Sequence, residues 1–279
     1  YADDGFGADL DSAAYALDTT TVDLCLSLFP WAHFQRHKAA VKLHTMLDLR
    51  GNIPVIVHID DGKSYDTDIL DVIVPEAGAI YVMDRGFFDL VRLRRLTTAA
   101  AFFVVRAKDR HCVRRIASRS VDRSSGIICD QIVELTIRQS AQKYPDRLRR
   151  IRYRDPQTGK TLIFLSNNFT IAPRTIADLY RCRWQIELFF KWIKQHLRIK
   201  SFFGTSANAV KTQIWIAVAV YVLIAIVKKR LRLEASLYTI LQTISVTVFE
   251  KAQLDQLLAI SPNAHDEMPS NNQLNLFAN

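Results

Sequence analysis

The stretch GAIYVMDRGFFDLVRLRRLTTAAAFFVVRA, residues 78–107, decides the fold class. Residues 79–83 form a short apolar run, which predicts a strand buried on both faces. Apolar residues then recur at helical spacing over residues 87–96, and residues 99–107 form a second run typical of a strand. Strand, helix and strand in this order favour a parallel pair joined by a crossover. The stretch therefore predicts an α/β protein.

Three more strands are predicted upstream of this unit. Residues 15–28, 40–49 and 55–59 are rich in branched and apolar side chains. The turn RGNIP, residues 50–54, separates the last two runs, and so short a turn predicts an antiparallel hairpin. With a short helix near residues 67–74, the first half is expected to read β-β-β-α-β-α-β. This order predicts a mixed sheet, with an antiparallel three-strand meander beside parallel strands, flanked by helices.

The pattern changes after residue 107. Helical spacing fades, and residues 127–137, 148–155 and 160–167 look like strands. We therefore expect residues 108–172 to form a β-rich insertion.

Three helices are predicted in the remainder of the chain, over about residues 178–199, 207–233 and 237–260. A polar tail follows, and its composition is typical of a disordered segment. The expected organisation is a first part of the core in 1–107, a β-rich basic insertion in 108–172, a helical part of the core in 173–260, and a disordered tail in 261–279.

The charge of the chain is strongly basic and localised. The formal net charge is +9 and the pI is about 9.5. Residues 106–160 contain 15 Lys and Arg against 6 Asp and Glu, so this segment accounts for the whole excess. A basic segment of this kind favours a polyanionic partner, and nucleic acid is the usual one. An ordinary solvated basic face is the alternative.

The four cysteines and the N-terminal residues favour a reducing compartment. No two cysteines form a C-x-x-C pair, and none has a histidine at zinc-site spacing. They are expected to be buried thiols. The N-terminal sequence YADDGFGADL has neither the basic start nor the apolar core of a signal peptide. A cytoplasmic location is therefore expected.

One stretch resembles a membrane span in composition. Residues 214–227 are 14 uninterrupted apolar residues, followed by three basic ones. A spanning helix needs about 18 or more apolar residues. We therefore expect a fully buried core helix here, with a membrane segment as the alternative.

The run DLYRCRWQIELFFKWIKQHL, residues 178–197, is predicted to form one helix with a narrow polar stripe. At about 100° per residue, four side chains fall within a sector of about 60°: Tyr180, Arg183, Glu187 and Lys194. Nearly all neighbouring positions are apolar. The stripe is either an ordinary solvent face with an i,i+4 ion pair, or a buried stripe whose partners are a metal and a phosphate.

Two further carboxylates are candidates for a metal site. Asp18 stands inside an apolar strand, where a charge is costly without a purpose. Asp84 follows a strand, and ligands of open α/β sheets gather at the carboxyl ends of strands. The alternatives are an edge-strand residue for Asp18 and a helix cap or turn for Asp84. Other aspartates compete less well because they fall in loops or near turns: Asp48, Asp60, Asp61 and Asp66.

Other common chemistries lack their motifs. The sequence contains no G-x-S-x-G, no H-E-x-x-H and no glycine-rich phosphate loop. With 9 glycines in 279 residues, a nucleotide-binding fold is disfavoured. A two-metal phosphoryl-transfer site, which needs clustered carboxylates, remains the best-supported chemistry.

The sequence resembles the insertion-sequence-four family of bacterial DDE transposases. The spacing Tyr180-x2-Arg183-x3-Glu187-x6-Lys194 matches the Tyr-Arg-Glu-Lys signature of that family. The segment LDTTTVDLCL at residues 17–26 looks like the strand with the first Asp, and YVMDRGFFD at 81–89 looks like the second-Asp motif. The stretch FPWAHFQRHKAAVKLHTMLDLRGNIP, which follows the first strand, is similar too. The resemblance covers about residues 13–235.

This resemblance implies an RNase H-like fold with a β-rich insertion between the second Asp and the Glu. It implies a catalytic triad that binds two Mg²⁺ or Mn²⁺ ions, formed by Asp18, Asp84 and Glu187.

The resemblance also implies the partners and the reaction. Tyr180, Arg183 and Lys194 would contact phosphates of transposon-end DNA. Water would attack the phosphodiester, and the freed 3′-hydroxyl would then attack target DNA, giving cut-and-paste transposition. A homodimer on DNA and a nucleoid-associated location in the bacterial cytoplasm are expected in the same way.

One feature departs from the family pattern. Members usually carry a helical DNA-binding region before the first-Asp strand, whereas 17 residues precede Asp18. The expectation is an N-terminally truncated copy with an intact catalytic core. The alternative function is a degenerate or truncated copy that binds DNA without catalysis.

Overall fold

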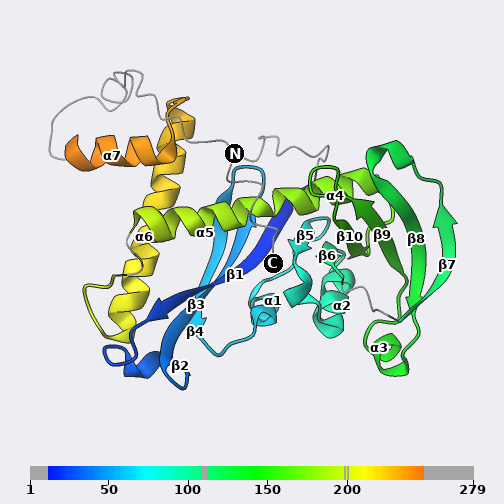
Figure 1. Cartoon of the computed structure of the whole chain (residues 1–279), viewed down its shortest axis with the longest axis horizontal. Helices are drawn as coiled ribbons and strands as arrows, with labels where there is room; N and C mark the ends of the chain where they lie inside the picture. The colour runs from blue at the N-terminus through cyan, green and yellow to red at the C-terminus, as the bar shows by residue number, and fades with distance from the viewer. Residues whose placement is uncertain (1–11, 108–111, 198, 200, 248–279) are drawn as a thin grey trace. The chain divides into compact units, whose positions relative to one another are not determined.

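A mixed sheet organises most of the chain in the computed structural model, which describes residues 12–107, 112–197, 199 and 201–247 (Figure 1). Ten strands join in it among these residues, in the order β2-β3-β1-β5-β6-β10-β9-β8-β7, with β4 paired to β3. The strands are β1 Ala14–Leu24, β2 His33–Gln35, β3 Lys38–Asp48, β4 Ile53–Asp61, β5 Ile80–Met83, β6 Phe102–Arg106, β7 Val113–Arg119, β8 Ile127–Leu135, β9 Leu148–Arg154 and β10 Thr161–Ser166.

The helices follow the chain order of Figure 1. They are α1 Ile69–Val72, α2 Leu90–Thr98, α3 Arg138–Lys143, α4 Pro173–Cys182, α5 Trp184–His196, α6 Ala207–Arg230 and α7 Leu237–Thr247. Short 3-10 turns are η1 Pro30–Ala32, η2 Asp66–Asp68, η3 Arg85–Phe87 and η4 Arg123–Ser125.

The chain divides into two compact units. The first comprises Tyr1–Trp192 and Thr205–Ala207, and it contains the whole sheet. The second comprises Ile193–Gly204 and Asn208–Asn279.

Five strands of the first unit confirm the predicted core. Their order is β4-β3-β1-β5-β6: the first three pair antiparallel, whereas β1–β5 and β5–β6 pair parallel. This is the predicted meander beside parallel strands, and the fold is RNase H-like. The helix α2 connects β5 to β6 as the crossover that a parallel pair requires.

Alternation along β1 separates the two faces of the sheet. Tyr15 and Leu17 belong to a buried cluster with apolar residues of α1 and α2, including Ile69 and Leu93. Successive side chains of a strand point to opposite faces. Asp18 therefore lies on the face opposite to the one that α1 and α2 cover.

The strands of the predicted insertion extend the same sheet. β10 pairs antiparallel with β6, and β9, β8 and β7 follow outward. The β-rich character of residues 127–167 is confirmed, but β7 was not predicted. Its residues are exposed except for the half-buried Val113, so the alternation that signals a half-buried strand is absent.

The single helix predicted over residues 178–197 is wrong. α4 ends at Cys182 and α5 begins at Trp184, with Arg183 between them. Arg183 has helical dihedral angles, φ −53° and ψ −28°, and its carbonyl accepts a tight i+3 hydrogen bond from Ile186 at 3.1 Å. The backbone hydrogen-bond pattern thus changes at Arg183. Tyr180 before it and Glu187 after it still lie on the same side of the two helices as Arg183.

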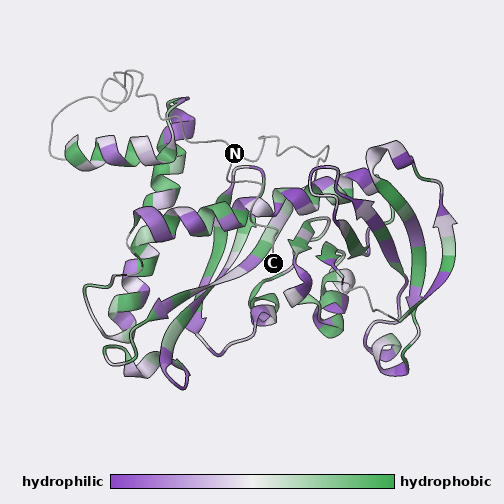
Figure 2. Cartoon of the chain, viewed as in Figure 1, coloured by the Kyte–Doolittle hydropathy of each residue, from purple (hydrophilic) through white to green (hydrophobic). Residues whose placement is uncertain are grey.

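The fully buried helix predicted around residues 214–227 is also wrong. Six residues of α6 are buried, but Trp215, Ile216 and Leu223 are 49%, 57% and 60% exposed. Figure 2 shows the hydrophobic stretch of α6 in green. By length and composition α6 could cross a membrane. Within the second unit, Ile224 of α6 packs with Ile240 of α7. This contact with α7 covers only part of the surface of α6.

Two predicted features lie wholly or partly outside the described residues. The description of α7 ends at Thr247, so its predicted continuation to residue 260 and the predicted tail at 261–279 are not covered.

The predicted burial of the cysteines is wrong. All four are free thiols, but Cys25 and Cys112 are exposed, and Cys129 and Cys182 are half-buried. Cys25 and Cys112 lie in loops, Cys129 on β8 and Cys182 at the end of α4, and the surrounding chain does not enclose them.

Candidate active site

Asp18 lies on a central strand and faces the junction of α4 and α5. β1 is paired on both sides, with β3 and β5, so the alternative of an edge-strand residue is wrong. The Asp18 side chain is 21% exposed, and its Oδ2 accepts a hydrogen bond from Nη1 of Arg183 at 2.9 Å. Its Oδ1 accepts the backbone N–H of Thr19 at 2.8 Å. The carboxylate is therefore held by its own strand and by the helical junction.

Asp84 follows β5 directly, at the carboxyl end of a parallel strand. It occupies the N-cap position of η3, but its side chain makes no capping hydrogen bond, so the cap alternative does not account for it. Instead, Oδ1 accepts a hydrogen bond from the hydroxyl of Tyr180 at 2.9 Å. Nη1 of Arg106, at the end of β6, lies 4.0 Å from the same oxygen.

Arg183 joins two of the three predicted catalytic carboxylates. While Nη1 donates to Asp18, Nη2 donates to Oε1 of Glu187 at 2.5 Å. The guanidinium carbon also lies 5.5 Å from the ring centroid of Tyr180. Because the side chain of Arg183 is only 11% exposed, the stripe is not the ordinary solvent face that the spacing also allowed. Glu187 is partly open, with 32% exposure.

The electrostatics of the two aspartates differ. Burial raises the pKa of Asp18 to about 6; Arg183 and the Thr19 N–H oppose this, and the negative charges of Glu187 and Asp84 add to it. Burial acts in the same direction on Asp84, but the hydrogen bonds from the Arg85 backbone and Tyr180, with the nearby arginines, hold its pKa below the ordinary value. The negative charges of Glu187 and Asp84 thus lie close enough to Asp18 to act on its ionisation.

Nearby charges also change the pKa values of Arg183 and Tyr180. Burial would lower the pKa of Arg183, but Asp18, Tyr180 and Glu187 raise it, so the guanidinium stays charged. Burial raises the pKa of Tyr180 to about 12, with Asp84 adding to the effect and Arg183 opposing it. Tyr180 is therefore a neutral hydrogen-bond donor at physiological pH.

The fourth stripe residue belongs to the other unit. Lys194 is on α5, about two turns after Glu187, but it groups with Ile193–Gly204 in the second compact unit. The structure therefore brings together Tyr180, Arg183 and Glu187 with the two aspartates. It places Lys194 further along the same helix as Glu187.

The competing aspartates have structural partners. Asp48 is buried and pairs with Arg50 through hydrogen bonds of 2.6 and 3.0 Å. Asp66 pairs with Lys42 at 2.9 Å. The carboxylates of Asp60 and Asp61 accept backbone N–H groups at the start of the following loop. None of these residues contacts the three predicted carboxylates through a described interaction.

The donor set fits a divalent metal chemically. Carboxylate oxygens are the ligands that Mg²⁺ prefers, and Asp84 and Glu187 lie close enough to Asp18 for their negative charges to act on it. Within the described residues, no three acidic, histidine or cysteine side chains are already grouped as metal ligands. The Arg183 guanidinium lies between two of the carboxylates and neutralises them. A metal could therefore be held by these residues after Arg183 shifts.

Two neighbours of the site were not assigned from the sequence. Arg106 was counted only within the basic segment, and Phe164 was part of a predicted strand. The ring of Phe164 packs 4.8 Å from that of Tyr180. The sequence pattern could have identified Arg106. It ends the strand after the one that Asp84 follows, and the carboxyl ends of neighbouring parallel strands lie together.

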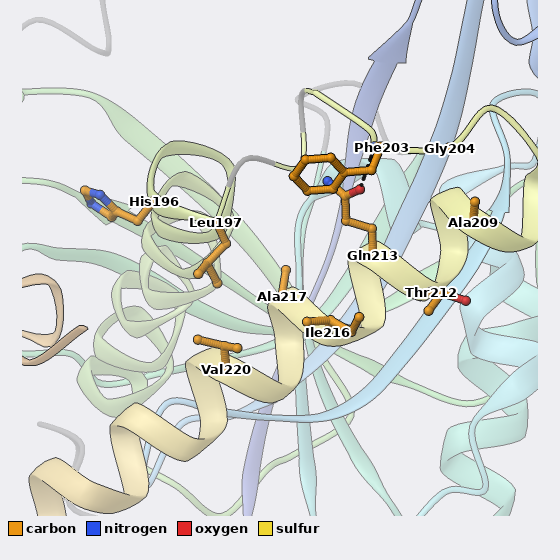
Figure 3. A pocket seen from close by; sticks show the side chains of 10 residues that line it. All are labelled: His196, Leu197, Phe203, Gly204, Ala209, Thr212, Gln213, Ile216, Ala217 and Val220. Atoms are coloured by element: carbon orange, nitrogen blue, oxygen red, sulfur yellow. Dashed lines mark hydrogen bonds between the residues drawn. The ribbon is translucent and has the colours of Figure 1, made fainter. Parts of the chain in front are cut away.

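A cavity of about 470 Å³ lies within the second unit, between α6 and the end of α5 (Figure 3). The described residues of its lining are mainly apolar and include no Lys, Arg, Asp or Glu, although His196, Thr212 and Gln213 contribute polar atoms. The amide of Gln213 is engaged with the backbone of Ser201 and Phe203. Among the described lining residues, His196 is the one titratable side chain.

Comparison with known proteins decides the family. A family model described as a transposase DDE domain matches residues 10–223. The chain belongs to the DDE transposase family. The matched range includes the catalytic candidates Asp18, Asp84 and Glu187 and most of α6. The apolar stretch of α6 is thus largely part of the transposase domain.

Individual relatives support this membership. A Sinorhizobium fredii protein named transposase y4zB is 31% identical over 241 residues, which cover 85% of this chain and 67% of the relative. A Geobacillus stearothermophilus protein, named as a transposase for insertion sequence element IS5377, is 32% identical, covering 75% and 55%. The transposase domain thus spans between about half and two thirds of the length of these relatives.

A solved structure shows a weaker similarity. The cryo-EM structure of the piggyBac transposase synaptic complex with hairpin DNA aligns with a TM-score of 0.47 at 10% identity. The alignment covers 89% of this chain and 51% of that chain.

Proposed function

We propose that this chain is the catalytic domain of a DNA transposase of the insertion-sequence-four family, which cleaves at insertion-sequence ends and transfers the strand to target DNA. The observation that carries the proposal is the gathering of Asp18, Asp84 and Glu187 by Tyr180 and Arg183. Asp18 comes from β1, Asp84 from the residue that follows β5, and the other three from α4, α5 and the residue between them. The Tyr-Arg-Glu-Lys spacing supports the assignment to this family.

Asp18, Asp84 and Glu187 would hold two Mg²⁺ or Mn²⁺ ions. Bound divalent ions activate an attacking oxygen and stabilise a leaving oxygen. In the first step, water adds to phosphorus at the transposon end, and the bond to the 3′ oxygen breaks, leaving a 3′-hydroxyl. In the second step, this hydroxyl attacks a target phosphodiester, forming a new P–O bond and releasing a target 3′-hydroxyl. Before DNA binds, the hydroxyl of Tyr180 keeps the carboxylate of Asp84 oriented.

Tyr180, Arg183 and Lys194 are proposed to contact phosphates of the transposon-end DNA. Arginine suits this role because its planar fork donates two hydrogen bonds to one phosphate. The partners are accordingly transposon-end and target DNA, with a homodimer joining two ends. The bacterial cytoplasm, in association with the nucleoid, is the proposed location.

Residues 108–172 are proposed to be an inserted subdomain that adds basic surface for DNA. Not every arginine there is available. Arg149 is buried against Asp130, and both Arg114 and Arg147 pair with Glu134. The side chains of Arg114 and Arg147 nevertheless remain 69% and 61% exposed, so they can also bind phosphates of the DNA backbone.

The test is metal-dependent cleavage and strand transfer on DNA that carries the element's terminal repeats. Asp18→Ala, Asp84→Ala and Glu187→Ala should each abolish both products while leaving the folded state intact by circular dichroism. Asp61→Ala, at the exposed end of β4, is the matched control and should retain activity. Cleavage by any of the three variants would disprove the triad. Salt-sensitive DNA binding by the unmodified chain without products in Mg²⁺ would support the alternative, a copy that binds DNA without catalysis.

A further inference from the structure

The Arg183 guanidinium occupies the place where a cation is needed. Its two terminal nitrogens donate to one oxygen each of Asp18 and Glu187, at 2.9 and 2.5 Å. Carboxylates crowded in a partly dry site repel each other, and an opposite charge within a few ångströms relieves that repulsion. Arg183 pairs with both of these carboxylates, whereas Arg106 stands beside Asp84.

The oxygens that Arg183 uses are those that a metal would need. A carboxylate oxygen that accepts a short hydrogen bond from a guanidinium directs a lone pair at it, and a metal ion needs the same lone pairs. The absence of a ready-made metal group among the described residues fits this arrangement, since the carboxylates enclose a guanidinium. A divalent ion held by these same two oxygens would lie against the Arg183 guanidinium, and two cations that close repel each other.

The contacts of Arg183 also leave it with unused hydrogen-bonding capacity. Its Nε is buried but has no hydrogen-bond partner in the described part of the chain. A buried donor without a partner is unfavourable. A phosphate could accept from Nε and from one terminal nitrogen together, which would satisfy the group that the carboxylates leave unpaired. The position of Arg183 between α4 and α5 places this exchange at a break in the helix.

We propose that Arg183 is an internal counter-cation: it occupies the carboxylate site in the metal-free protein and moves to a DNA phosphate when the metal binds. The proposal rests on the proposed function and assigns to Arg183 a positioning role that couples the two ligands. DNA that draws Arg183 away increases metal affinity, and by linkage the metal increases DNA affinity by the same factor. The site is thereby assembled fully only when both ligands are present.

The first experiment measures Mn²⁺ binding by calorimetry without DNA. Arg183→Gln removes the charge and keeps hydrogen-bonding atoms, and Arg181→Gln makes the same charge change on an exposed neighbour that pairs with Asp178. Arg183→Gln should bind Mn²⁺ at least about fivefold more tightly than wild type, and Arg181→Gln should stay within about twofold. Equal or weaker Mn²⁺ binding by Arg183→Gln would overturn the proposal, since Arg183 would then organise the ligands and not compete with the metal.

A second measurement uses the unmodified chain and so does not depend on a folded variant. Nitrogen NMR of the arginine side chains should show Arg183 with restricted guanidinium rotation in EDTA. Saturating Mg²⁺ should release that restriction, and a short DNA duplex added afterwards should restore it with a different chemical shift. An Arg183 signal that Mg²⁺ does not change would contradict the exchange.

The failure of this inference can be told apart from the failure of the proposed function. If the wild type binds no Mn²⁺ and Asp18→Ala retains cleavage, the catalytic assignment is wrong. If the wild type binds Mn²⁺, Asp18→Ala loses cleavage and Arg183→Gln leaves Mn²⁺ affinity unchanged, only the counter-cation role is wrong.

Discussion

Arg106 Nη1 lies 4.0 Å from Oδ1 of Asp84, and both residues stand at the carboxyl ends of neighbouring parallel strands. The register of the sheet produces this pairing, because Met83 of β5 is opposite Val105 of β6. Each side chain is about one third exposed. An exposed pair of this kind adds little stability but leaves a cation at the rim of the site.

Arg106→Gln should therefore weaken DNA binding with little loss of stability. The free energy of unfolding should fall by less than about 1 kcal/mol. The slope of log affinity against log salt should decrease by about 1, as for a lost phosphate contact. Fluorescence anisotropy at several salt concentrations measures the slope. Arg94→Gln, an exposed position on α2, is the control, and an equal loss of slope there would show a general charge effect.

Tyr180→Phe should reduce cleavage because Asp84 loses its hydroxyl donor. The change removes one hydrogen bond of 2.9 Å to a partly buried carboxylate. We expect a loss of about 1 kcal/mol in stability and a rate of DNA cleavage lower by about tenfold. Tyr144→Phe is the matched control, since it removes a buried tyrosine hydroxyl that contacts Thr97 away from the site. It should lower stability and leave cleavage per folded molecule unchanged; loss of cleavage in both variants would count against a role for Tyr180.

Asp18 should make the metal-free protein less stable as pH rises. Its pKa is about 6 in the folded chain and 3.8 as an unperturbed group. The folded state thus binds this proton more tightly than the unfolded state does. The contribution of Asp18 to the stability of the fold is therefore complete below about pH 4 and is lost as pH rises through about 6. The difference in unfolding free energy, Asp18→Asn minus wild type, should increase by about 3 kcal/mol over that range. Urea unfolding in EDTA measures it. A difference that decreases with pH would show that pairing with Arg183 outweighs burial.

Arg149→Met should destabilise the segment that leads into α4. Arg149 is 1% exposed and forms a two-pronged ion pair with Asp130 at 2.7 and 2.9 Å. Its Nη1 also donates to the carbonyls of Asn168 and Ile171, just before α4. Removing the arginine leaves a buried carboxylate unpaired, at a cost of about 3–5 kcal/mol.

The double variant Arg149→Met with Asp130→Leu is the control for this pair. It removes both charges and should recover a large part of the lost stability, because no buried charge remains unpaired. Urea unfolding midpoints compare the two proteins. A double variant as unstable as Arg149→Met alone would show that the carbonyl contacts of Arg149 matter more than the ion pair.

The predictable part of the fold came from local patterns. Branched and apolar runs located the strands around Asp18 and Asp84, and their order implied the mixed sheet. β7 was missed because nearly all of it is exposed and its side chains show no alternation. The burial of α6 was overestimated for a related reason. Apolar composition shows that a residue favours burial, but the neighbouring elements decide how much surface is covered.

The sequence by itself determined the family of this protein. It contains three carboxylates with a tyrosine, an arginine and a lysine at a defined helical spacing, which is enough to predict a DDE transposase domain. Only the tertiary structure decided how these charges pair. Arg183 reaches Asp18 across 165 residues of sequence and Tyr180 reaches Asp84 across 96. Such pairs depend on the order of strands in the sheet and on where α4 meets α5. Local sequence preferences specify neither, because they act over only a few residues along the chain.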